Sequence, residues 1–232
     1  MTASINRRGF MGVAGACGAA AFLAAPLHAQ GLGDLLGGSG LNLSSILGKA
    51  TDNALDKLAQ PGAFYGDEDV RIGLPLIGNL GGSAGGLLGS ILGGASRLGI
   101  LDGITRNIND AAGVAAGEAK PIFRDAIDGL SFTDAPGIIR ESDGGTQYLR
   151  RSANDRLHAR LEPLVDGALE RAGVYKTFDG LAEDHSFIRD AGLDRGRINR
   201  SVTDQGLDGI FSYIGAEERD FRKNPLGGLL GS

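Results

Sequence analysis

The 232-residue chain carries 23 lysine and arginine residues against 28 aspartate and glutamate residues, giving a formal net charge of -5 at pH 7. This acidic balance argues against nucleic acid as the main partner, because phosphate binding depends on a positive surface. The only cysteine is Cys17, which excludes an intrachain disulfide and a metal site built from several thiolates.

The first 29 residues have the layout of a cleavable export signal. Arg7 and Arg8 stand ahead of residues 9–27, which carry no charge, and this order matches the basic and apolar regions of a signal peptide. The arginine pair followed by Phe10 resembles the twin-arginine signal, which a receptor reads when it exports folded proteins. We expect the twin-arginine export machinery to bind Arg7 and Arg8, cleavage after Ala29, and a periplasmic mature protein.

Two other roles of this segment stay open. A retained membrane anchor needs roughly 20 apolar residues, and this stretch is shorter and diluted with glycine. A lipoprotein signal would acylate Cys17, but the three residues before that cysteine include no leucine. Release into the periplasm therefore fits better than membrane association.

Residues 30–42 are predicted to form a disordered leader, and residues 43–225 a single all-α domain of several helices without a sizeable sheet. The first helix is expected to end before Pro61 and Gly62. Its apolar residues recur at the three-and-four spacing of one helix face, namely Leu43, Ile46, Leu47, Ala50, Ala54 and Leu58. Residues 63–75 have no helical period, which predicts an extended connection.

A glycine-rich insert occupies residues 76–99. Its large apolar residues keep a helical period, glycines recur every four residues, and no charge occurs between Ile72 and Ser96. Glycine ladders bring helices close together in membranes, so a membrane span is one alternative. Because each glycine costs up to about 1 kcal/mol of helix propensity relative to alanine, a close-packed or fraying helix is preferred. Such a segment would form a mobile cover over an apolar ligand.

Helical periods resume after the insert. Residues 100–119 present one apolar face, and a further helix is predicted to begin at Pro121. Thr133 is expected to cap a short helix that follows.

The longest helix is predicted next. Thr146 is expected to cap it, Pro163 to kink or divide it, and Gly173 to end it. A last helix resumes at Val202, and residues 226–232 are predicted to be a flexible tail.

The predicted longest helix carries a cluster of arginines interleaved with acidic residues. Alternating charge of this kind is typical of a solvated helix face. The alternative is an anion or headgroup site, because clustered arginines suit bidentate binding of phosphate or carboxylate. The candidate ligand-binding residues are Tyr148, Arg150, Arg151 and Arg156.

Two segments, IFRDAIDGLSFTDAPGIIRESDGGTQYLRRSANDRLHARLEPLVDGAL and TDQGLDGIFSYIGAEERDFRKNP, resemble the bacterial domain of unknown function family 4197. The resemblance extends more weakly to ILGKATDNALDKLAQPGAFYGDEDVRIGLP and covers most of residues 44–225. It implies an exported, largely helical protein, and it brings no activity, cofactor or site residue. Residues 76–99 depart from the family pattern, because glycine replaces the usual charged helix residues.

No catalytic residue, metal ion or cofactor is assigned. His158 and Glu162 share a helix face, but a metal site needs three or more ligands. Asp184, His185 and Ser186 are adjacent in sequence, which is not the geometry of a catalytic triad. The glycine-rich insert lacks the lysine of a phosphate-binding loop. Acidic pairs are plentiful, so carboxylate-based hydrolysis stays open.

The sequence favours a non-enzymatic periplasmic binding or envelope-associated module for a lipid, another small apolar molecule or an anion. The first alternative is a carboxylate-based periplasmic hydrolase, and the second is a structural protein–protein interaction module. An apolar cavity would favour a carrier. Converging carboxylates would favour a hydrolase, and the absence of both features would favour the interaction module.

Overall fold

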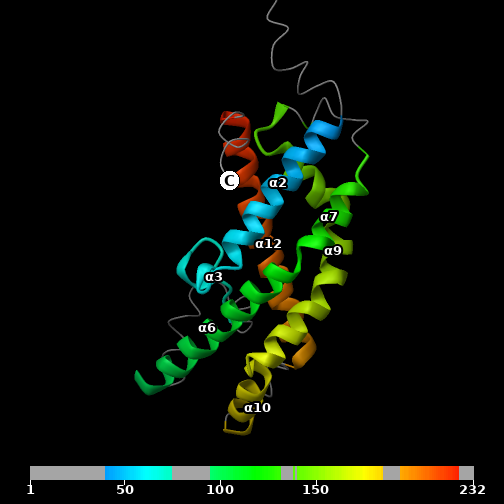
Figure 1. The fold of residues 1–232 in the computed structure, drawn as a ribbon. Coiled ribbons are helices and arrows are strands. Elements are labelled where there is room, and N and C mark those ends of the chain that lie inside the picture. The colour runs from blue at the N-terminus through cyan, green and yellow to red at the C-terminus, as the bar shows by residue number, and fades with distance from the viewer. Residues whose placement is uncertain (1–39, 75–94, 132–137, 139, 185–193, 225–232) are drawn as a thin grey trace, which may run out of the picture.

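The computed structural model describes residues 40–74, 95–131, 138, 140–184 and 194–224. These residues form an all-α fold, as the sequence predicts, and contain no strand. The helices are α2 (Gly40–Leu58), α3 (Ala63–Gly66), α6 (Ala95–Glu118), α7 (Lys120–Asp128), α9 (Gly144–Arg171), α10 (Val174–Asp184) and α12 (Arg195–Lys223) (Figure 1). None of these described helices is long and apolar enough to cross a bilayer.

Several predictions fall on residues outside this description. They are the export signal, the leader up to residue 39, most of the glycine-rich insert, the cap at Thr133 and the tail. The last three residues of the predicted leader, 40–42, belong to α2 instead. The mobile-cover hypothesis concerns the same insert and stays a prediction.

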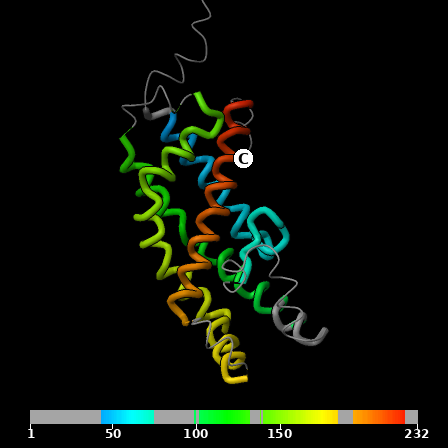
Figure 2. The backbone as a smooth tube through the Cα atoms, turned by 180° about the vertical axis from the view of Figure 1, so that it is seen from behind, coloured from blue at the N-terminus to red at the C-terminus, as the bar shows by residue number. Residues whose placement is uncertain are grey.

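The helices form an elongated bundle in which α9 and α12 lie side by side and run antiparallel (Figures 1 and 2). Helix α2 packs along α12 and also contacts α7. Helices α6 and α7 follow one another along α9, and α3 packs on α6. Helix α10 lies at the end of the bundle opposite the C-terminal end of α12 (Figure 1).

One face of each long helix supplies the core. The expected face of α2 is confirmed except that Ile46 is only partly buried, while Leu55 is fully buried. The rings of Phe123 and Phe211 meet edge to face with their centroids 6.1 Å apart, a favourable aromatic geometry. Other fully buried side chains come from four helices and include Leu47, Leu58, Ile108, Leu149, Leu157 and Ile198.

The segment predicted as an extended connection contains a helical turn. Gly62 adopts a left-handed conformation, with φ of 74°, which glycine reaches without steric cost. The chain then forms α3, in which Phe64 is buried against the core. The apolar pattern gave no sign of this turn because four residues are too few to show a helical period.

Residues 71–74 have no regular secondary structure, and two side-chain amides bind their backbone. Asn109 of α6 donates to the carbonyl of Ile72 and accepts from its N–H, both at 2.9 Å. Gln205 of α12 accepts from the N–H of Gly73 at 2.9 Å and donates to its carbonyl at 3.3 Å. The backbone N–H and C=O groups of Ile72 and Gly73 are therefore all hydrogen-bonded without a sheet partner.

A buried carboxylate from α12 binds the first turn of α9. Glu218 is fully buried and accepts hydrogen bonds from the N–H of Gly145 at 3.0 Å and from the N–H and hydroxyl of Thr146, both at 2.7 Å. Arg222, one turn further along α12, donates to the same carboxylate at 2.7 Å. The two backbone donors, of Gly145 and Thr146, are among the N–H groups that a helix start leaves without intrahelical partners.

The prediction that Thr146 caps this helix was wrong. Asp143 occupies the N-cap position and makes no side-chain capping bond. Thr146 lies inside the first turn and donates, because the acceptor comes from a distant helix rather than from the local sequence. The two glycines before it are sterically required: a Cβ on Gly144 would collide with the carbonyl of Ile138, and one on Gly145 would lie 2.9 Å from Glu218 Oε1.

Helix α9 runs through Pro163 without interruption for 28 residues. It is nevertheless shorter than α12, which has 29, so the prediction that it would be the longest was wrong. The expected end is confirmed, since Gly173 has a φ of 71° just beyond Arg171.

We expect Leu157→Ala to lower the free energy of unfolding by about 2–5 kcal/mol, because it removes a fully buried side chain. Urea denaturation monitored by circular dichroism measures the loss. Arg151→Ala on the exposed side of the same helix is the control and should cost less than about 1 kcal/mol. A stable Leu157→Ala or a strongly destabilised Arg151→Ala would contradict the packing of α9.

We expect Glu218→Ala to lower the free energy of unfolding by about 3–5 kcal/mol, because it leaves Arg222 and the start of α9 without their buried acceptor. Amide hydrogen exchange of Gly145 and Thr146 should accelerate together with this loss. The matched control is Glu141→Ala, an exposed carboxylate in the preceding loop, with a change within about 0.5 kcal/mol. Equal stability of the two variants would refute the capping role.

Candidate functional site

The candidate anion site lies on α9, and the packing of that helix decides which way its side chains point. Leu149, Ala153 and Leu157 are buried, so the neighbouring polar residues lie on the flanks and on the outer face. Arg150, Arg151 and Arg156 are exposed as expected, and Tyr148 is half-buried.

Arg150 leaves α9 on the flank that faces α12. Its guanidinium forms an ion pair with Asp208 of that helix and lies over the ring of Phe211, with 5.4 Å between Cζ and the ring centroid. Both charged groups of this pair are more than half exposed, so the ion pair contributes at most about 1 kcal/mol. The contact nevertheless fixes where the guanidinium lies.

Tyr148 and Arg156 interact on the other side, with the end of α7 and the residues after it. The hydroxyl of Tyr148 donates to the carbonyl of Ser131 at 2.7 Å. Nη2 of Arg156 donates to the carbonyl of Ala126 at 3.3 Å, in the last turn of α7, where carbonyl groups lack helical partners and favour a cation. These two contacts hold α7 against α9.

Arg151 makes no hydrogen bond or ion pair with any residue that the structure describes. The four candidate residues therefore leave α9 in three directions, and the structure does not bring them into one cluster. A joint anion site would require Arg150 to release Asp208 and Arg156 to release Ala126. The site stays a prediction, with Arg151 as the member that has no hydrogen bond or ion pair to the described residues.

The histidine and glutamate singled out in the sequence, His158 and Glu162, each contact a different residue of α12. His158 Nε2 lies 3.0 Å from Asp204 Oδ1 of α12, without the alignment of a hydrogen bond. The backbone carbonyl of Glu162 accepts from the side chain of Asn199 at 3.1 Å. The described part of the chain contains no group of three or more potential metal ligands, and His185 lies outside it.

Sequence reasoning missed a charged cluster where α9, α10 and α12 meet. Arg195 binds both carboxylate oxygens of Asp166, at 2.9 and 2.7 Å, and also pairs with Glu170. Tyr175 donates to Asp166 at 2.8 Å and lies under the same guanidinium. The Arg195 guanidinium lowers the pKa of Asp166, and burial raises the pKa of the Tyr175 hydroxyl.

The spacing of Asp166 and Glu170 signals this cluster in part, because residues four apart share a helix face. Their partner, Arg195, follows residues 185–193 in the sequence, and the sequence alone does not predict that it lies next to them. The arrangement joins three helices and uses both acidic groups in ion pairs.

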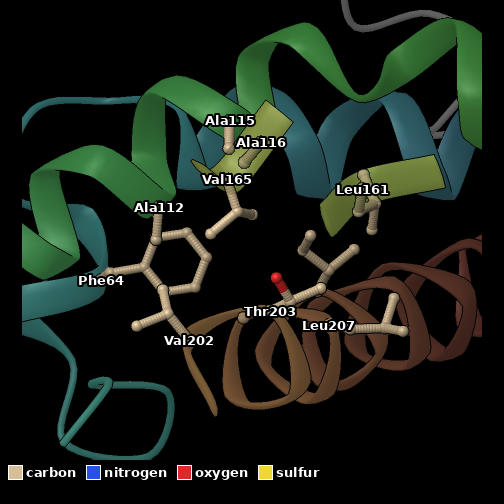
Figure 3. A pocket seen from close by; sticks show the side chains of 11 residues that line it. Phe64, Ala112, Ala115, Ala116, Leu161, Val165, Val202, Thr203 and Leu207 are labelled. Carbon is tan, nitrogen blue, oxygen red and sulfur yellow. The ribbon is translucent and has the colours of Figure 1, made fainter. Parts of the chain in front are cut away.

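A small pocket lies between α3, α6, α9 and α12 (Figure 3). Alanines of α6 form one wall, and Figure 3 shows Leu161, Val165 and Val202 on the others. Its volume is about 20 Å³, which is room for one water molecule. Its wall includes one polar residue, Thr203, whose hydroxyl lies 3.3 Å from Asn199 Oδ1.

Residues 39–228 match the family model described as Protein of unknown function (DUF4197). No curated protein and no solved structure matches the chain. The family match spans every described helix, from α2 to α12. The chain therefore belongs to the DUF4197 family of proteins.

Proposed function

We propose that the protein is an exported, envelope-associated module without catalytic activity that binds its partner at its surface. The observation that carries this proposal is the small size of the pocket that lies between the described helices. The pocket between α3, α6, α9 and α12 has a volume of about 20 Å³, whereas small-molecule sites need about 300–1,000 Å³. A ligand enclosed by these helices would first have to displace packed core side chains.

The contacts of the buried and partly buried acidic residues favour this module over the hydrolase alternative. A pair of catalytic carboxyl groups must face a common substrate and exchange protons with it. The least exposed carboxylates instead bind cations: Glu218 binds Arg222, Glu217 binds Lys57, and Asp143 binds Arg219. The pair with Lys57 holds α12 to α2, and the pair with Asp143 holds α12 to the residue before α9.

The export route fits a protein that is folded before it leaves the cytoplasm. The twin-arginine machinery carries folded proteins, and this bundle depends on contacts between distant parts of the chain, such as Glu218 with Gly145. Arg7 and Arg8 remain the residues that we propose the machinery reads.

We expect the double variant Arg7→Lys, Arg8→Lys to lose periplasmic accumulation, because the lysines keep the charge but not the pair that the receptor reads. Immunoblots of periplasmic and cytoplasmic fractions measure the loss, with Arg140→Lys as a control outside the signal. N-terminal sequencing of the exported protein should begin at Gln30. Normal periplasmic yield of the double variant would show export by the general secretion route.

Native mass spectrometry of the protein purified from its own periplasm tests the function itself. We expect the mass of the processed chain, alone or with a second polypeptide, because the pocket between α3, α6, α9 and α12 is too small for a ligand of drug-like size. A copurified small molecule in one-to-one ratio would overturn the surface-binding proposal and favour a carrier.

A further inference from the structure

A half-buried tyrosine, Tyr65, at the junction of α3 and α6 carries two guanidinium groups over its ring. Arg106 Cζ lies 4.1 Å and Arg71 Cζ 4.8 Å from the ring centroid of Tyr65. The hydroxyl of Tyr65 donates to Asp102 of α6. This bond raises the pKa of the tyrosine and lowers that of the carboxylate, so the hydroxyl stays protonated and Asp102 stays ionised.

Each guanidinium donates one hydrogen bond through its Nε atom. Arg71 Nε donates to the carbonyl of Tyr65 at 2.6 Å, and Arg106 Nε donates to Asp102 at 2.8 Å. Their terminal Nη groups make no hydrogen bond or ion pair with the described residues. Both arginines are exposed, so two fixed sets of N–H donors face solvent.

The support beneath this pair is rigid. Phe64, the neighbour of Tyr65, is buried in the core, and Ile72, the neighbour of Arg71, is bound by Asn109 on both sides of its backbone. Side chains that are already ordered lose less conformational freedom on binding. The arrangement resembles a prepared binding surface more than a pair of freely rotating surface arginines.

The charge around the pair selects the kind of ligand. Asp102 bonds to Arg106 directly, Asp67 interacts electrostatically with Arg71, and Asp110 with Arg106. Three carboxylates against two guanidinium groups leave a net charge of about −1 around the pair, which disfavours a phosphate dianion more strongly than a singly charged anion. A carboxylate carries one charge and has the planar shape that the guanidinium fork binds through two parallel hydrogen bonds.

We propose that Arg71 and Arg106, stacked on Tyr65, form a binding site for a carboxylate group. The ligand that we propose is an aspartate or glutamate side chain of a partner protein. This choice of ligand rests on the proposed function. A free small carboxylate would bind through the same donors, so the experiment separates the two sources.

The test is nuclear magnetic resonance of the purified protein, following the Nε–H signals of Arg71 and Arg106 at constant ionic strength. The probes are sodium acetate, the capped peptide Gly-Gly-Glu-Gly-Gly, its glutamine counterpart, and sodium phosphate. We expect saturable shifts with acetate and the glutamate peptide, with dissociation constants on the order of 10 mM. Phosphate should bind more weakly, and the glutamine peptide should not shift these signals.

Matched variants distinguish a role of the two arginines in binding from a role in holding α3 in place. Arg71→Lys with Arg106→Lys keeps the charge but removes the forks and with them the arginine Nε–H signals. Acetate binding is therefore compared between this variant and the unaltered protein through the backbone amide signals of Tyr65 and Asp102, and it should be about tenfold weaker in the variant. Arg200→Lys, an exposed arginine of α12, should leave binding unchanged. Thermal unfolding confirms that each variant is folded before its binding is read.

The outcomes are distinct. Absence of a saturable acetate shift, tighter binding of phosphate, or unaltered binding by the double lysine variant would overturn the carboxylate site. Acetate binding without binding of the glutamate peptide would support the site and refute a protein side chain as its ligand. A carrier result in native mass spectrometry would refute the proposed function and leave the carboxylate site standing.

Discussion

The contact on which the bundle most depends is the one between the Glu218 carboxylate and the start of α9. Moving a charge out of water is costly, and it is tolerated here because N–H groups, a hydroxyl and Arg222 surround the carboxylate. The positive end of the α9 dipole adds to the stabilisation. Because the donors belong to α9 and the acceptor to α12, the bond also fixes how far the two helices slide along each other.

The register set at this end continues along the whole antiparallel pair. As the residue number rises along α9 it falls along α12, and each step brings polar groups into contact: Thr146 with Glu218, Arg150 with Asp208, His158 with Asp204, Glu162 with Asn199 and Asp166 with Arg195. A shift by one turn would separate all of them. The exposed pairs contribute little individually, and their value lies in selecting one register over its neighbours.

Much of the fold could be predicted from the sequence. The apolar faces of α2, α6 and α12 follow helical periodicity, and Ile104, Ile108 and Ile214 are buried where that pattern requires. Local reasoning failed where the partner is distant: Thr146 was expected to act on its own helix, but its acceptor stands 72 residues away. The candidate site shows the same limit, because the spacing of Arg150 and Arg156 places them on a polar surface and says nothing of Asp208 or Ala126.

The stretch from Asp143 to Thr146 also affects how tolerance to mutation should be interpreted. A Cβ atom on Gly144 would overlap the backbone of Ile138, and one on Gly145 would overlap the carboxylate of Glu218. Any larger side chain at either position would therefore displace main chain or a buried charge. In a saturation library, these positions and Glu218 would stand out as an intolerant cluster of glycine, threonine and glutamate, which is the pattern usually attributed to an active site. In this protein such a cluster marks the seam between two helices, and positions that lose activity while keeping the fold must be sought elsewhere on the surface.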